Sequence, residues 1–518
     1  MYVRTNTTPT APRAIARQWW GLLVLLLPAL LVSMDISILF IAGPAISRDL
    51  APNATQWLWM MDSYSLVVAS LLVTMGSLAD RIGRRRLLLM GSVVFGVASV
   101  LLAFAPTPEL FIAGRVLLAV GAATLAPSTF ALVRGMFLDP DQRRKAVAAW
   151  TIAFTGGAVL GPVLGGLLLE HFDWGSVFLI NLPIMALLLI AAPLLIQESK
   201  DPAGARFDIP GAALSLAALV ALMYALKGFA EYGSEPQSWI TLTAGLVLLA
   251  CFVGWQRRSA HPLIDVALFR RPAFTGAATA NLLATVAMTG LGLLAFALLQ
   301  SVHGLGPLHA GLVALPTFFG TAAGAMTGTA LAKRVRPATI VAGGLTISGA
   351  SMGFISLTMP TESVWAFLGG YVVLTYGIGM VSTLANSLIL TTAPREQAGA
   401  AASISETAIH LGSALGIAGF GTISTTAYRQ RMEVASVPDM PPAATESIGA
   451  AEAVAAQLPE PRAEQLLEAA TTAFSDSVGT VALVASAVLI LAAVITGTLL
   501  HRVPPGTTSE TGSLTENE

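Results

Sequence analysis

Four charged residues stand inside long apolar stretches of the sequence, and they are the residues most able to do chemistry there. They are Asp35, Asp62, Arg115 and Glu406. Around Asp35, in "SMDISILF" (33–40), thirty residues (18–47) carry no other formal charge. A charged side chain at the centre of a membrane costs about 2.5–3.5 kcal/mol on insertion scales. A carboxyl group in such a low-dielectric setting takes up a proton more readily than in water, so it can hold either a proton or a cationic ligand.

The composition indicates a polytopic membrane protein. Of the 518 residues, 55% are hydrophobic and 11% are charged, whereas soluble domains carry about 25% charged residues. The mean hydropathy is +0.74. The formal net charge of -1 gives no reason to expect a nucleic-acid partner. Cys251 is the only cysteine, so no disulfide can form within the chain. The polar, mildly basic start (1–18) leads directly into a full-length apolar run, so we expect no cleaved signal peptide.

Apolar runs separated by charged, Pro-rich or Gly-rich breaks predict fourteen membrane-spanning helices, because only helices or closed barrels satisfy the backbone in lipid. The predicted spans lie near 20–42, 55–77, 87–105, 109–131, 147–169, 176–197, 209–227, 237–256, 273–300, 308–332, 337–359, 363–390, 398–425 and 477–501.

Lys and Arg predict the orientation of these spans. They gather in the N-terminal segment and the even-numbered loops, as in "RIGRRR" (81–86), "RRK" (143–145) and "KRVR" (333–336), and the odd-numbered loops hold little beyond Arg48 and Lys227. By the positive-inside rule, both termini are expected to be cytoplasmic in the plasma membrane. The long connection 426–476 then lies outside as two short amphipathic helices, either as a solvated cap or as an acidic vestibule that enriches cations.

Two six-span halves are expected to flank a central pair of spans. Small residues and a basic cluster follow the second span of each half, in "GSLADRIGRRRLLL" (76–89) and "GTALAKRVRPATIV" (328–341), a weak internal repeat of the kind transporters show. The predicted units are a cytoplasmic tail (1–19), an N-terminal six-helix bundle (20–197), a linker with the two additional helices (198–260), a C-terminal six-helix bundle (261–501) and a second cytoplasmic tail (502–518).

The depths of the charged residues follow from a rise of about 1.5 Å per residue. Asp35 and Asp62 are expected roughly 10 Å below the outer surface, Arg115 at roughly 9 Å, and Glu406 roughly 12 Å from the cytoplasmic face. Arg115 is expected to pair with Asp35 or Asp62. Two acids against one arginine leave negative charge unbalanced, so a proton-coupling or cation-binding role is predicted for Asp35, Asp62 and Glu406. A structural ion pair is the alternative reading for each.

Two glycine-rich motifs add to this pattern. In "GAVLGPVLGG" (157–166), Gly157, Gly161 and Gly165 recur at a spacing of four, which lets another helix approach closely, and Pro162 interrupts the backbone hydrogen bonds. In "GSLADRIGRRR" (76–86), Asp80 can cap or pair while the arginines face anionic headgroups. Generic helix packing and a simple stop-transfer cluster are the alternative readings.

Together these stretches resemble the major facilitator superfamily, and within it the fourteen-span drug:proton antiporters of the QacA and SmvA type. The loop motif matches at Gly76, Asp80, Arg81, Gly83, Arg84 and Arg85, and the antiporter motif matches at Gly157, Gly161, Pro162, Gly165 and Gly166. Further matches are "RVLLAVGAA", which holds Arg115, and "MDISILFIAGP", "LWMMDSYSLV", "LLEHFDWGSVFLINLPI" and "SETAIHLGSALG". The resemblance covers nearly the whole chain.

The resemblance implies an all-α membrane protein of the major facilitator fold, with two six-helix bundles around a central cavity and two additional helices. It implies that Asp35, Asp62 and Glu406 serve proton coupling or cation recognition, with Arg115 as their charge partner. It also implies that the 76–86 loop and the span-5 motif govern the conformational switch. Two departures, Thr321 and Ser405 where some relatives carry acids, reduce the negative charge of the cavity, which favours monocationic or mixed substrates over dicationic ones.

The predicted function is proton-driven export of lipophilic, cationic compounds by a monomer, with no cofactor and no metal. Trp57, Trp59 and Tyr64 could line an aromatic cavity or belong to the interfacial belt. Export of one endogenous metabolite or self-made antibiotic is the first alternative, and a membrane sensor without transport is the second. No nucleophile or metal motif accompanies the spans, so we expect no enzyme.

Overall fold

The computed structural model describes residues 14–200, 208–232, 235–259, 266–361, 363–392, 398–435 and 441–504. All regular elements within these ranges are helices. The first ones are α1 (Ala16–Leu50), α2 (Ala54–Ile82), α3 (Arg84–Ala103), α4 (Pro108–Met136), α5 (Pro140–His171), α6 (Ser176–Leu179), α7 (Asn181–Leu195), α8 (Ile209–Tyr232) and α9 (Pro236–Arg258). After the short 3-10 helix η1 (Val266–Arg270) come α10 (Pro272–Ala297), the π-helical turn η2 (Leu298–Val302), α11 (Pro307–Leu331), α12 (Pro337–Thr358), η3 (Met359–Thr361), α13 (Val364–Thr392), α14 (Ala398–Val434), η5 (Pro442–Thr445), α15 (Ile448–Ala455) and α16 (Glu460–Leu500).

Twelve helices of the described chain are long and apolar enough to cross a membrane, and α2 makes a thirteenth when it is counted across its bend. The predicted span at 398–425 lies in α14, which is helical throughout but is not among these thirteen. Its sequence, "AGAAASISETAIHLGSALG" and onward, is rich in small and polar residues, which lowers its hydropathy. The protein is therefore an all-helical, multi-pass membrane protein, and the count of fourteen spans stays a prediction.

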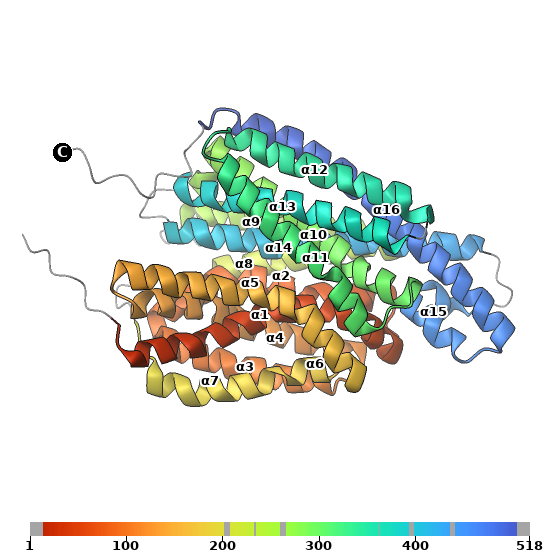
Figure 1. Cartoon of the computed structure of the whole chain (residues 1–518), viewed down its shortest axis with the longest axis horizontal. Coiled ribbons are helices and arrows are strands. Elements are labelled where there is room, and N and C mark those ends of the chain that lie inside the picture. Colours follow the sequence, from red (N-terminus) through yellow and green to blue (C-terminus); the bar gives the residue numbers. More distant parts are fainter. Residues whose placement is uncertain are drawn as a thin grey trace, which may run out of the picture.

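Two groups of helices lie side by side in Figure 1, with α1 to α7 in the lower group and α10 to α14 and most of α16 in the upper one, while α15 lies at the right end, near the start of α16. Within the first group α1 packs on α5 and α3 on α4, and within the second α11 packs on α13 and α12 on α16. Between the groups, α2 packs on α14 and α5 packs on α11. The hairpin of α8 and α9 joins this seam, because α8 packs against both α2 and α14.

The two ends of the molecule differ. We call the end where α1 begins and α16 ends the tail end, and the opposite end, which carries α15, the cap end (Figure 1). The helices alternate in direction, so α2, α4, α11 and α13 begin at the cap end while α3, α5, α10 and α14 begin at the tail end. The antiparallel arrangement follows from the short connections between successive helices.

The long connection 426–476 has a different structure from the two short amphipathic helices predicted there. The helix α14 continues to Val434, the 3-10 helix η5 and the eight-residue α15 follow, and α16 starts at Glu460 and runs on into the last predicted span without a break. The second predicted helix is therefore the first part of α16. At the cap end, α15 packs against α1 as well as α16.

Candidate functional site

Asp35 and Arg115 form an ion pair inside the first helix group. Nη1 of Arg115 on α4 donates to Oδ2 of Asp35 on α1 over 2.7 Å, and the two side chains are 2% and 3% exposed. The guanidinium also lies over the ring of Tyr64 on α2, 4.6 Å from its centroid. Three helices therefore meet at one charge pair, and an arginine suits this place because its planar cation can bind a carboxylate and stack on an aromatic face together.

Asp62 pairs with Lys227, a residue that the sequence pattern places in a loop. Nζ of Lys227 on α8 donates to Oδ1 of Asp62 over 2.9 Å, and these side chains are 1% and 0% exposed. The same ammonium lies 3.5 Å from the centroid of the Trp59 ring. The expectation that two acids share one arginine and leave negative charge unbalanced is therefore wrong. Each acid has its own base.

One feature of the sequence indicates that Lys227 lies inside a helix. The predicted span ended at 227, but α8 continues to Tyr232 and keeps Lys227 five residues inside the helix. The uncharged residues Gly228, Phe229 and Ala230 follow the lysine, so the sequence does not become polar directly after it. A basic residue followed by more apolar helix has to find a partner inside the protein.

Glu406 has a different environment from the two aspartates. It lies on α14, about 12 Å along the helix from Ala398 at the tail end. Its side chain is exposed, and within the described chain no basic residue forms an ion pair with it. One turn further on, His410 is buried, and its Nδ1 has no hydrogen-bond partner in the described part of the protein.

The neighbouring Ser405 belongs to a cluster of uncharged polar groups. Its hydroxyl donates to Oδ1 of Asn386 on α13 over 2.5 Å, and Nδ2 of Asn281 on α10 donates to the same oxygen over 3.2 Å. The other departure, Thr321 on α11, is partly buried and donates to the carbonyl of Thr317 over 3.2 Å. At both positions neutral hydrogen bonds stand where an acid would add charge.

The span-5 motif provides two close helix contacts. A Cβ on Gly157 would lie 2.2 Å from the carbonyl oxygen of Leu30, and one on Gly161 would lie 2.1 Å from Oγ of Ser37, so the motif packs directly on α1. Gly165 likewise meets Ile38 of α1. On the cap-end side, a Cβ on Gly166 would lie 2.7 Å from Cα of Leu308 in α11.

The second contact also involves Pro162. Because Pro162 cannot donate a backbone hydrogen bond, it sits inside α5 as a local break in the ladder. Its carbonyl oxygen lies 2.6 Å from the place a Cβ on Gly311 would take. Glycines on both α5 and α11 therefore let the two helix groups touch backbone to backbone at the cap end.

The loop between α2 and α3 is held within the first helix group. Arg84 pairs with Asp80 over 2.8 Å, and the carboxylate of Glu198 accepts from the backbone N–H groups of Arg85 and Arg86, which open α3. Gly83 between the helices has a φ of 112°, which favours glycine, and a Cβ there would lie 2.6 Å from Cδ of Glu198. Arg81 is exposed, and a Cβ on Gly76 would meet nothing within 4 Å.

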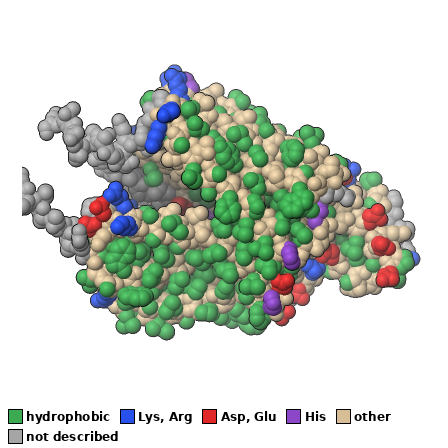
Figure 2. All heavy atoms as spheres, viewed as in Figure 1, with side chains coloured by type: hydrophobic (Ala, Val, Ile, Leu, Met, Phe, Trp, Pro, Cys, Tyr) green, Lys and Arg blue, Asp and Glu red, His purple; other side chains and the backbone are tan. Residues whose placement is uncertain are grey.

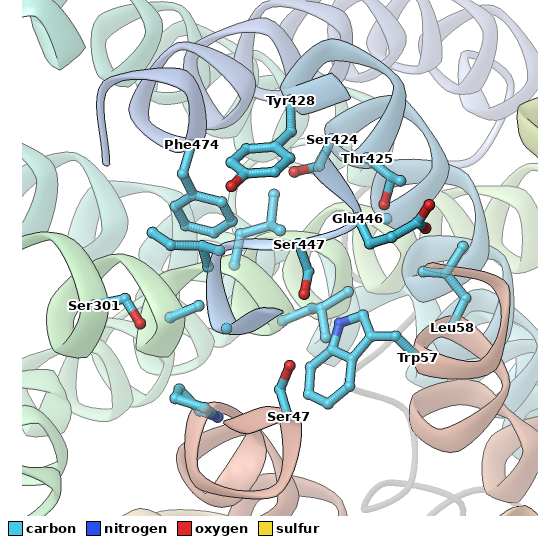
Figure 3. Close-up of a pocket in the computed structure, with 17 residues that line it drawn as sticks. Ser47, Trp57, Leu58, Ser301, Ser424, Thr425, Tyr428, Glu446, Ser447 and Phe474 are labelled. Carbon is cyan, nitrogen blue, oxygen red and sulfur yellow. The ribbon is translucent and has the colours of Figure 1, made fainter. Parts of the chain in front are cut away.

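A small cavity lies between the two helix groups at the cap end (Figure 3). Its lining includes Trp57 of α2, Ser301 of η2, Tyr428 of α14 and Phe474 of α16, and the turn between η5 and α15 contributes Glu446 and Ser447. Its volume of about 60 Å³ is well below the roughly 300 Å³ of the smallest ligand pockets. The cavity is therefore too small to hold a drug-sized molecule.

Polar contacts close the cap end around this cavity. Nε2 of Gln300 donates to the carbonyl of Ile41 over 2.9 Å, and Arg48 on α1 pairs with Glu452 on α15 over 3.1 Å. Glu446 accepts from the backbone N–H of Ala54 over 3.2 Å. At the tail end, by contrast, Figure 2 shows a recess between the two helix groups. The protein is therefore closed at the cap end and hollowed at the tail end.

Comparison with known proteins decides the family. The profile of the Major Facilitator Superfamily matches residues 25–417. The chain belongs to this superfamily. Membership makes it a transporter-family protein rather than an enzyme, and within the described residues no group of three His, Cys, Asp or Glu side chains could hold a metal ion.

Curated relatives and solved structures agree with this assignment. The chain is 42% identical over 500 residues to the multidrug efflux pump LfrA of Mycolicibacterium smegmatis, covering 96% of this chain and 99% of that protein. It is 34% identical to the methyl viologen resistance protein SmvA of Salmonella typhimurium, covering 88% and 93%. A bacterial homologue of the lysosomal transporter Spinster, 16% identical with a TM-score of 0.64 and covering 94% of this chain and 98% of its own, shares the fold.

Proposed function

We propose that this superfamily member exports lipophilic, monocationic compounds such as drugs, antiseptics and dyes across the plasma membrane in exchange for protons. The observation that carries the export of drugs is the 42% identity to a multidrug efflux pump over nearly the full length of both chains. The cationic preference and the proton coupling rest on the three acids of the spans, Asp35, Asp62 and Glu406.

The closed cap end and the recessed tail end correspond, in this proposal, to an inward-open state. The basic loops lie at the tail end, which is the cytoplasmic side by the positive-inside rule. In this state Glu406 is exposed and has no ion-pair partner within the described residues, so its carboxylate is available to attract a cation that enters from the cytoplasm. Thr321 and Ser405 add no further negative charge, which fits a substrate that carries one positive charge.

Proton exchange then acts on the ion pairs. When the protein opens at the cap end, a proton that reaches Asp35 or Asp62 neutralises the carboxylate and weakens its attraction to Arg115 or Lys227. Deprotonation on the cytoplasmic side restores the pair. Binding of the cation and binding of the proton exclude one another wherever they share a carboxylate, and this exclusion couples the two fluxes.

Dye efflux from energised cells tests the proposal. Cells that express the wild type, Asp35→Asn, Asp62→Asn or Glu406→Gln are loaded with ethidium, and efflux is followed with and without a protonophore. We expect the protonophore to stop wild-type efflux and each substitution to lower its rate at least tenfold. Glu464→Gln is the matched control, because Glu464 is an exposed acid near the start of α16 at the cap end.

Two results would contradict the proposal. If all three variants exported every tested cation at the wild-type rate, the acids would have no part in transport. If efflux continued unchanged in the presence of the protonophore, protons would not drive it.

A further inference from the structure

The Lys227–Asp62 pair joins the additional hairpin to the first helix group. Lys227 comes from α8, in the stretch between the two six-span halves, while Asp62 and Trp59 come from α2. Their charged groups are fully enclosed, with side-chain exposures of 1% for Lys227 and 0% for Asp62. α8 therefore inserts a positive charge into the transporter, where a simple lipid-facing helix would need none.

Trp59 and Asp62 together have the chemistry of an organic-cation site. An aromatic face and a carboxylate are the two groups by which proteins recognise ammonium and quaternary ammonium ligands. Here the Lys227 ammonium takes both of them, at 3.5 Å from the ring centroid and 2.9 Å from Oδ1. The second carboxylate oxygen, Oδ2, is buried and has no hydrogen-bond partner within the described residues. Only one of the two carboxylate oxygens of Asp62 is thus bonded to the lysine.

A groove beside the pair could receive the Lys227 ammonium when it leaves Asp62. It lies between the cap ends of α2 and α8, has a volume of about 200 Å³, and is lined by Asn53, Thr55, Gln56 and Tyr224 on the way to Trp59 and Lys227. A lysine has a flexible four-carbon stem, so its ammonium can swing while the helix stays in place. The polar groove would hydrate the displaced ammonium.

We propose that Trp59 and Asp62 form a binding site for a monovalent organic cation, and that Lys227 occupies this site as a tethered competitor. A substrate cation enters by displacing the ammonium, one positive charge for another. Lys227 thereby sets the charge preference of the protein, because a dication would bring a second charge next to the displaced lysine. This proposal deepens the proposed function and rests on it.

Equilibrium binding to the purified protein tests the competition. The probe is tetraphenylphosphonium, and methyl viologen is the dicationic comparison. We expect Lys227→Gln and Lys227→Met to tighten tetraphenylphosphonium binding at least tenfold and methyl viologen binding by more, while Lys227→Arg, which keeps a cation able to occupy Trp59 and Asp62, brings no such gain. Adding Asp62→Asn or Trp59→Leu to Lys227→Gln should remove the gain. Unchanged or weaker cation binding by folded Lys227→Gln would overturn the proposal.

Lysine labelling of the wild type tests the displacement without any substitution. An amine-reactive reagent and mass spectrometry measure the labelling of each lysine with and without saturating tetraphenylphosphonium. We expect the cation to raise the labelling of Lys227 at least fivefold and to leave the exposed Lys145 and Lys333 unchanged. If the labelling of Lys227 stays constant or falls, the ammonium is not displaced and the proposal fails.

Transport by the wild type in proteoliposomes with an imposed pH gradient separates a failure of the tethered competitor from a failure of the proposed function. Proton-driven tetraphenylphosphonium transport together with unchanged Lys227 labelling would overturn only the tethered competitor. Absence of both binding and transport of cations by the folded wild type would overturn the proposed function, and the competitor with it.

Discussion

At the scale of single residues, each of the two buried ion pairs combines a carboxylate, a base and an aromatic ring. Moving a charge out of water costs several kcal/mol, and a buried pair recovers this cost only if its geometry is good. Arg115 meets Asp35 at 2.7 Å and also stacks on Tyr64, so its cation has two partners on two helices. Asp62 uses one oxygen for Lys227 and leaves the other without a hydrogen bond in the described structure. Nε of Arg115 is likewise buried without a partner in the described structure, so each pair leaves one polar atom unsatisfied.

Removal of Arg115 alone should destabilise the protein strongly. Arg115→Leu leaves Asp35 as an unpaired buried carboxylate, and breaking a buried pair on one side costs about 3–5 kcal/mol. We expect a clearly lower apparent melting temperature in detergent for Arg115→Leu than for the double variant Asp35→Asn/Arg115→Leu, which has no orphaned charge. Thermal unfolding followed by tryptophan fluorescence checks this. Equal melting temperatures for the two variants would show that the ion pair has no such role.

Gly83 and Gly76 offer a matched pair within one motif. Gly83→Ala places a side chain at a φ of 112° and within 2.6 Å of Glu198, and strained left-handed backbone costs about 1–3 kcal/mol. Gly76→Ala adds a methyl group in open space inside a helix, where alanine is favoured by about 1 kcal/mol. We expect a lower melting temperature and slower export for Gly83→Ala and neither effect for Gly76→Ala. Equal behaviour of the two variants would contradict this account of the loop.

The sequence predicted the residue types of the site better than their partners. It singled out Asp35, Asp62 and Arg115 because charges inside apolar runs are rare, and it placed them at one depth. It could not choose which acid Arg115 pairs with, since that depends on how α1, α2 and α4 rotate about their axes. It missed Lys227 because the predicted end of α8 fell on the lysine itself, and a charge at a span end is usually solvated.

At the scale of helices, α5 is the element in which the sequence motif and the packing agree most closely. The spacing of four predicted one glycine face, and the structure uses that face against α1, at Leu30 and Ser37. The contact of Gly166 with α11 could not be predicted, because it depends on how the two helix groups meet.

The helix α14 is the element that the sequence predicts least well as a membrane span. Its many small and polar residues suit its place between both groups, and for the same reason hydropathy identifies it poorly as a span.

Gly166→Ala should shift the protein away from its cap-closed state. The added Cβ would lie 2.7–2.9 Å from backbone atoms of α11, which cannot move aside as a side chain can, so α5 and α11 must separate. Gly156→Ala is the control, since a Cβ there meets nothing within 4 Å. In a Cys251→Ser background, with Ser301→Cys as a reporter in the cap-end cavity, we expect a membrane-impermeant maleimide to label Gly166→Ala several-fold faster than the control. Equal labelling rates would show that this contact does not hold the cap end closed.

At the scale of the whole molecule, the connection 426–476 ties the two helix groups together at the cap end. It belongs to the second group, between α14 and α16, yet α15 packs on α1. Its contacts with the first group are the Arg48–Glu452 ion pair, the hydrogen bond from Ala54 to Glu446 and the close approach of Gly449 to Ser47. These contacts cross the seam between the groups, so the cap end cannot open unless they break. The sequence predicted a cap here but not that it would bridge the two groups.

A reversible cross-link tests this requirement directly. A Cβ on Gly449 lies 2.9 Å from Cβ of Ser47, and a disulfide needs about 3.5–4.5 Å, so a displacement of about 1 Å permits the bond. In a Cys251→Ser background, Ser47→Cys/Gly449→Cys should lose ethidium export on oxidation, because alternating access requires the cap end to open, and should regain it with dithiothreitol. Each single cysteine variant should export dye under both conditions. Normal export by fully cross-linked protein would mean that α15 stays on α1 throughout the cycle and that the groups separate elsewhere.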